Sequence, residues 1–103
     1  MSIETVMRQQ ANDDLGGMLV EITGWQLGCD NAAKRARDII AAINDGLVGF
    51  RTHFAKAFPD GVEFYEITDK GLAYVRERCG DEAAEWASDN REFYRKNASK
   101  RIA

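Results

Sequence analysis

The clearest helical pattern in the chain lies between residues 33 and 47. Its apolar positions recur at intervals of three and four and form one stripe along a helix: Ala33, Ala36, Ile40, Ile43 and Leu47. Ile39 widens this stripe, and Gly46 is placed to end the helix. The stripe predicts a helix that packs on the core through Ile40. Lys34 and Asp38 are expected on the opposite face, one turn apart and able to pair.

Two shorter helical patterns precede this one. Residues 2–11 carry apolar side chains at helical spacing, with Ser2 as an N-cap. Gly16 and Gly17 then interrupt the pattern, and a short helix is expected from Met18 through Trp25, stopping at Gly28. A tight turn at residues 29–31 would separate that helix from the main one.

The segment after Gly46 changes to the two-residue period of a strand. Alternate residues share one side, namely Val48, Phe50, Thr52 and Phe54. Arg51 and His53 fall on the other side. A loop over residues 55–61, closed by a turn at Pro59, and a second β-rich run over residues 62–67 predict a two-stranded hairpin with a long tip.

Two further helices follow the hairpin. Thr68 is placed to cap the first, whose inward residues are Leu72, Val75 and Cys79. The second begins near Asp81 and carries an aromatic stripe, Trp86, Phe93 and Tyr94, that either packs on the body or pairs with a second copy. Its basic end is expected to be a frayed extension: Arg95, Lys96, Lys100 and Arg101. The fold class predicted is mostly helical α+β, with one domain over residues 1–103.

Two segments of this order resemble a known superfamily. The run Ile39-Ile40-Ala41-Ala42-Ile43-Asn44-Asp45-Gly46-Leu47-Val48 is similar to the end of a winged-helix recognition helix, where "Gly-Leu-Val" starts the wing. The run Phe64-Tyr65-Glu66-Ile67-Thr68-Asp69-Lys70-Gly71-Leu72 resembles the "Tyr-x-Leu-Thr-x-x-Gly" segment of MarR- and PadR-type transcriptional regulators. The resemblance implies a winged helix-turn-helix, with the helix-turn-helix at about 18–46, the wing at about 47–67 and the C-terminal helices at about 68–98.

The resemblance also implies a function, namely transcriptional regulation through double-stranded DNA. The third helix would enter the major groove and the wing would lie along the backbone. The residues implied as DNA contacts are Asn31, Lys34, Arg35, Arg37 and Asp38 on the helix, and Arg51, His53 and Lys56 on the wing. A homodimer through the C-terminal helix would present two such helices to successive grooves.

The charge distribution also allows a second interpretation of the function, in which the domain binds a protein. The net charge is −3, but five basic and two acidic side chains lie in residues 31–56, and five basic and one acidic in residues 91–103. Two basic patches therefore sit on an acidic body, and local charge decides where a polyanion docks. Asp38 in the implied reading face and Phe58 near the wing tip oppose DNA binding. They favour a protein-binding winged helix, such as an inhibitor or antirepressor from a phage or another mobile element.

Several kinds of chemistry are not expected from this composition. Cys29, Cys79 and one histidine cannot supply the four ligands of a zinc site, so no metal or other cofactor is predicted. No nucleophile–base pattern or glycine-rich phosphate loop is present, and we expect no enzymatic activity. No apolar run is long enough for a membrane span and no leader pattern opens the chain, which predicts a cytoplasmic protein.

Overall fold

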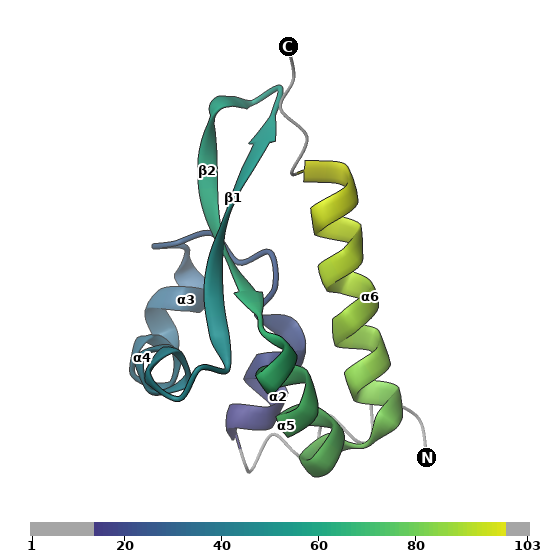
Figure 1. The fold of residues 1–103 in the computed structure, drawn as a ribbon. Helices are drawn as coiled ribbons and strands as arrows, with labels where there is room; N and C mark the ends of the chain where they lie inside the picture. The colour runs from purple at the N-terminus through teal and green to yellow at the C-terminus, as the bar shows by residue number, and fades with distance from the viewer. Residues whose placement is uncertain (1–13, 99–103) are drawn as a thin grey trace.

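The computed structural model describes residues 14–98 and has a mostly helical α+β fold, in which two helices follow a two-stranded antiparallel hairpin (Figure 1). The elements in chain order are α2 (Asp14–Glu21), α3 (Asp30–Lys34), α4 (Ala36–Asn44), β1 (Val48–Ala55), β2 (Phe58–Ile67), α5 (Asp69–Cys79) and α6 (Asp81–Ala98). The helix expected over residues 2–11 lies outside the described residues, as do Lys100 and Arg101.

The hydrophobic core lies where α2, α5 and α6 meet the base of the hairpin. Its fully buried side chains include Met18, Leu19, Ile22, Ile67 and Val75. Small residues line the inner side of α6, where Ala83, Ala84 and Ala87 are all buried, and this allows the helix backbone to approach closely. Cys79 is also buried, as expected of a small hydrophobic side chain, and neither Cys79 nor Cys29 forms a disulfide.

The segment predicted as one helix over residues 33–47 differs from the expectation in two ways. Arg35 has non-helical backbone angles, φ −112° and ψ 19°, and divides the segment into α3 and α4. The buried positions of these two helices are Ala32, Ile39 and Ala42. Ile40, expected in the core, is 59% exposed. The predicted stripe was therefore displaced by one residue, because adjacent isoleucines fit either phase of the helical pattern.

Helix α2 begins earlier and ends earlier than the sequence pattern indicated. Gly16 and Gly17 lie inside it rather than before it. A Cβ at Gly16 would lie 2.8 Å from Sγ of Cys79, so the missing side chain allows α2 to approach α5. The helix stops at Glu21, and the predicted extension to Trp25 was wrong.

Residues 24–27 run antiparallel beside β2 instead of continuing the helix. The amide of Gly24 donates to the carbonyl of Tyr65 at 3.0 Å, and that of Tyr65 donates to the carbonyl of Trp25 at 2.9 Å. Leu27 donates to the carbonyl of Glu63 at 3.2 Å. Gly24 starts this segment with a φ of 95°, where a side chain is unfavourable. A short extended segment therefore pairs with β2 near the base of the hairpin, in addition to β1.

The hairpin is longer and its tip shorter than predicted. Val48 pairs with Ile67 at the base and Ala55 pairs with Phe58 at the end, so the tip consists of two residues, Lys56 and Ala57. The pairing is irregular between His53 and Ala55, opposite the part of β2 that contains Pro59 and Gly61. This irregularity accommodates a proline, which cannot donate to the ladder. The predicted loop over residues 55–61 was therefore wrong.

The junction between α4, the hairpin and α5 confirms the prediction that Thr68 caps α5. Thr68 accepts a hydrogen bond from the amide of Gly71 at 3.0 Å, as an N-cap does, and its hydroxyl donates to the carbonyl of Gly46 at 2.6 Å. A Cβ at Gly71 would collide with the carbonyl oxygen of Leu47. Only glycine permits this contact, which fixes the start of α5 against the turn between α4 and β1.

The two adjacent isoleucines give a direct test of the α4 phase. Ile39→Ala should lower the free energy of unfolding by roughly 2–5 kcal/mol, because the side chain is 2% exposed. Ile40→Ala should cost less than about 1 kcal/mol, since most of that side chain is already in water. Urea denaturation of both variants measures the difference, and equal losses would contradict the phase described here.

Candidate nucleic-acid interface

The two faces of the hairpin have different surroundings. Arg51 and His53 point to the face that α6 covers, where His53 lies 5.9 Å from Tyr94, measured between ring centroids. The opposite face carries Phe50, which is 53% exposed and lies 5.5 Å from the ring of Tyr65. The sequence placed Arg51 and His53 together correctly. However, their face is the covered one rather than the one open to a ligand.

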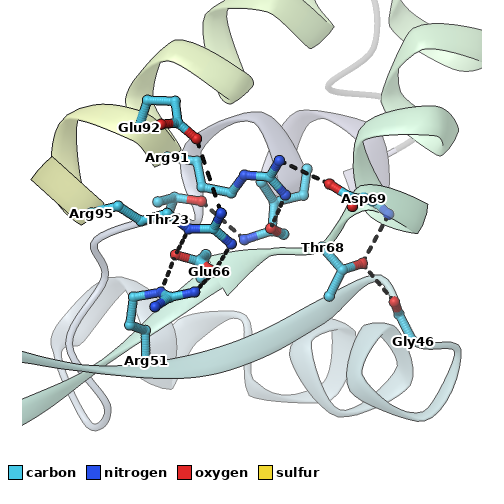
Figure 2. A network of polar contacts seen from close by, with 11 residues as sticks. Thr23, Gly46, Arg51, Glu66, Thr68, Asp69, Arg91, Glu92 and Arg95 are labelled. Atoms are coloured by element: carbon cyan, nitrogen blue, oxygen red, sulfur yellow. Dashed lines mark hydrogen bonds and ion pairs between the residues drawn. The ribbon is translucent and has the colours of Figure 1, made fainter. Parts of the chain in front are cut away.

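Glu66 is the centre of a three-residue ion cluster on the covered face (Figure 2). Its side chain is only 9% exposed. Arg51, from the neighbouring strand, donates to its two oxygens at 2.6 and 3.1 Å. Arg95, from α6, also donates to both oxygens, at 3.0 and 2.7 Å. One carboxylate therefore joins both strands of the hairpin to the last helix through four charge-assisted hydrogen bonds.

Arg91 lies one turn before Arg95 on α6 and binds the end of β2, the strand that carries Glu66. It is 8% exposed and donates to the carbonyl of Ile67 at 3.2 Å and to Asp69 at 2.8 Å. The amide of Ile67 donates to the hydroxyl of Thr23 at 3.0 Å. Two arginines counted in the basic C-terminal patch are thus engaged within the fold. The expectation that Arg95 belongs to a frayed extension was wrong, because α6 continues to Ala98.

The pKa values reflect this pairing. Burial by itself raises the pKa of Glu66, but the hydrogen bonds and positive charges of Arg95 and Arg51 outweigh it and lower the pKa below the ordinary glutamate value. The hydrogen bond from Arg95 to Glu66 correspondingly raises the pKa of Arg95. The carboxylate is therefore charged at neutral pH and bound by two cations.

His53 is a buried side chain of the hairpin, with 1% of its area exposed. Its ring lies edge-on to Phe64 at 4.8 Å between centroids. Burial lowers its pKa below the ordinary histidine value. Arg51 lowers it further, whereas the charge of Glu66 and a hydrogen bond with the backbone of Tyr94 act in the opposite direction. This placement leaves His53 neutral and without access to a DNA phosphate.

The α3–α4 segment holds most of the predicted contact residues on the surface. Asn31, Lys34 and Arg37 are exposed. Asp38 pairs with Arg35, at 2.9 Å between Nε and Oδ2, and not with Lys34 as the helical spacing suggested. The break at Arg35 explains the change of partner, since Lys34 and Asp38 do not lie on one continuous helix.

A shallow pocket of about 230 Å³ adjoins this segment. Its lining combines three of the predicted residues with two from the preceding segment: Asn31, Lys34, Arg35, Glu21 and Trp25. Trp25 is half-buried and Glu21 is exposed. The structure therefore brings Asn31, Lys34 and Arg35 together around one hollow, which the sequence reasoning did not foresee.

Lys56 lies apart from this group. It is exposed at the tip of the hairpin, which points away from α3 and α4 in Figure 1. The eight predicted residues thus form two surface locations and one internal cluster. Glu66, Arg91 and Arg95 were not predicted as structural residues. Only the register of the hairpin, which pairs Arg51 with Phe64, could have indicated that Glu66 lies diagonally opposite Arg51 on the same face.

Comparisons with known proteins do not assign this chain to a family. A scan against models of protein families found no match, and searches of curated proteins and of solved structures found no similar chain. Within residues 14–98, no group of three or more histidine, cysteine, aspartate or glutamate side chains is arranged to hold a metal ion. None of the helices described there is long and apolar enough to cross a membrane.

The lowered pKa values of His53 and Glu66 predict how stability depends on pH. The unfolded chain takes up a proton on His53 below about pH 6.5, while the folded protein resists it, so stability falls as the pH drops through that range. Glu66 adds a second loss below about pH 4.3, because the folded carboxylate is held charged by its arginines.

Urea midpoints of wild type and His53→Leu, measured between about pH 8 and pH 5, test the histidine contribution. Replacement by leucine removes the titrating group, so the midpoint of the variant should vary less over this range. An unchanged pH dependence would show that His53 does not titrate with unfolding. The loss of stability below about pH 4.3 that arises from Glu66 lies outside this range and should persist in both proteins.

Proposed function

We propose that the protein is a small DNA-binding regulator with a winged-helix arrangement, and that its α3–α4 segment carries the contact surface. The observation that supports this most is the exposure of Lys34 and Arg37, three residues apart, while Ala32 and Ile39 of the same segment are buried. Two cations at this spacing can reach neighbouring phosphates, and Asn31 before them is a side chain that pairs with adenine.

The order of elements supports the winged-helix part of the proposal. Helix α2 is followed by residues 24–27, which pair with β2, and then by α3, α4 and the hairpin. The resemblance described above implies the same sequence of a recognition helix and a wing. In this proposal α4 with its preceding turn is the recognition element, and Lys56 is the contact at the wing tip.

The proposed contact set is smaller than the one implied by the resemblance. His53 is left out because it is buried, and Arg51 is assigned to holding Glu66. Arg35 and Asp38 form a pair at the edge of the surface. Three exposed cations remain, so the logarithm of the affinity should fall with the logarithm of the salt concentration with a slope of about −2.7. Binding by one copy is therefore weak.

A second candidate is a protein-binding winged helix. The observation that favours it is the open face of the hairpin, where Phe50 is 53% exposed beside Tyr65 and the neighbouring exposed side chains are Thr52 and Glu63. Exposed aromatic side chains are enriched at protein interfaces, whereas a DNA-contacting wing needs cations. In this candidate the hairpin binds the partner, and Lys34 and Arg37 have no role.

Fluorescence anisotropy with random-sequence duplex DNA at low salt separates the two candidates. The Lys34→Ala/Arg37→Ala variant should bind at least ~10-fold more weakly than wild type, and its salt slope should be smaller by about 1.8. Lys70→Ala/Arg76→Ala removes the same charge from α5 and serves as the matched control. We expect that control to change the affinity less than about threefold.

Two results would reject the DNA-binding proposal. One is the absence of binding by the wild type at low salt. The other is an equal loss in both double variants, since this would reflect net charge rather than a surface on α3 and α4. Either result would favour the protein-binding candidate.

A further inference from the structure

Residues 24–27 add an extended segment beside β2 and bring an aromatic side chain with it. Gln26 lies opposite Phe64, and the ring of Phe64 lies on the face of the hairpin that α6 covers. Because side chains alternate along an extended segment, Trp25 belongs to the other face, which is open. In Figure 1, α6 lies to the right of the hairpin and α3 and α4 lie to its left.

Three aromatic side chains therefore form a row across the open face. The amide of Tyr65 donates to the carbonyl of Trp25 at 2.9 Å, and on its other side Tyr65 pairs with Phe50. Phe50 is 53% exposed, whereas Tyr65 and Trp25 are half-buried. Neighbouring strands lie about 4.8 Å apart, so Trp25 and Phe50 at the ends of the row are separated by roughly 9–10 Å.

The next row along the strands carries one charge. The amide of Leu27 donates to the carbonyl of Glu63 at 3.2 Å, and Glu63 pairs with Thr52 on β1. Glu63 and Thr52 are exposed. Of the six side chains in these two rows, only Glu63 is charged, and it lies two residues from Tyr65, about 7 Å along β2.

The charges beyond the indole end of the row largely cancel. Glu21 and Lys34 both line the hollow there, and Arg35 in the same hollow is paired with Asp38. A nucleic-acid strand lying over the aromatic row would meet the carboxylate of Glu63 without a cation on the same two rows to offset it. The row is therefore complementary to an apolar partner with a positive charge.

The spacing of the row matches a polyproline II helix. Such a helix has three residues per turn and rises about 3.1 Å per residue, so residues on the same side recur every ~9.3 Å. This is close to the separation of Trp25 and Phe50 across the strands. Aromatic surfaces bind such segments well, because a proline-rich chain is already extended and loses little entropy on binding.

We propose that the open face of the hairpin binds a proline-rich segment of another protein, which crosses the strands with prolines three residues apart on Trp25 and Phe50. A basic residue of that segment pairs with Glu63. This inference rests on the second candidate function, for which it specifies the partner. DNA binding by α3 and α4 involves a different surface, and its outcome does not bear on this one.

A nuclear magnetic resonance titration with a short peptide of consecutive prolines ending in arginine tests the site. The amide signals of Phe50, Thr52 and Glu63 should shift. Phe50→Ala should weaken binding at least ~10-fold, because it removes one of the two outer rings. Phe93→Ala, which removes a 59% exposed aromatic side chain from α6, is the matched control and should change the affinity less than about twofold.

A charge exchange tests the role of Glu63 and remains informative if Phe50→Ala fails to fold. The wild type should bind the arginine peptide about threefold more tightly than the same peptide ending in glutamate. Glu63→Lys should reverse this preference. A side chain that only supported the fold would change both affinities equally, so an unreversed preference would contradict the pairing with Glu63.

Two results would overturn the inference. One is a wild type that does not bind the proline peptide at about 1 mM, and the other is equal binding of a glycine–serine peptide that ends in arginine. Neither result rejects the second candidate function, which a partner of different chemistry would still satisfy. Shifts of the same signals by a single-stranded oligonucleotide, with none from the peptide, would also overturn the inference and assign the row to unpaired bases.

Discussion

The arrangement of the hairpin depends on the ion cluster centred on the carboxylate of Glu66. A two-stranded hairpin is marginal in water without a further surface to pack on. Here α6 supplies that surface, and Arg51 and Arg95 converge on Glu66 from the neighbouring strand and from the helix. Glu66 is the buried member of the cluster, with 9% of its side chain exposed, so losing its arginine partners would leave a charge with little access to water, which is costly. The cluster therefore fixes the angle between the hairpin and the last helix.

This arrangement has a consequence for the surface charge. Arg51, Arg91 and Arg95 are three of the ten basic side chains that the sequence concentrates in two patches, and all three donate to acceptors within the fold, although Arg51 and Arg95 stay 37% and 36% exposed. The cations exposed around the proposed interface are Lys34, Arg37 and Lys56. Any binding of DNA by a single copy thus rests on few contacts.

The parts of the fold that sequence analysis predicted well are those set by local chemistry. Thr68 and Gly46 were assigned correctly because a cap and a positive φ each require a particular residue type at one position. The phase of α4 was not predicted. Ile39 and Ile40 are equally apolar, and only the break at Arg35 and the packing of the whole chain choose between them.

The exposure of the candidate residues on α3 and α4 was predictable from the sequence, but the surroundings of those on the hairpin were not. The exposure of Asn31, Lys34 and Arg37 agrees with a surface function. The roles of Arg51 and His53 depend on a pairing register and on α6, which follows in the chain by some thirty residues. Their alternation along a strand was evident from the sequence. The coverage of their face by α6 was not evident, because no local pattern encodes a contact with a distant helix.

Amide hydrogen exchange, followed residue by residue in wild type and Glu66→Gln, tests most directly whether Glu66 holds the hairpin against α6. Asp38→Asn, which weakens a more exposed pair with Arg35, is the matched control. Glu66→Gln should accelerate exchange at least ~10-fold, in both strands and in the second half of α6 together, while Asp38→Asn should change these rates less than about twofold. Faster exchange confined to the residues next to Glu66, with the far strand and α6 unchanged, would contradict it.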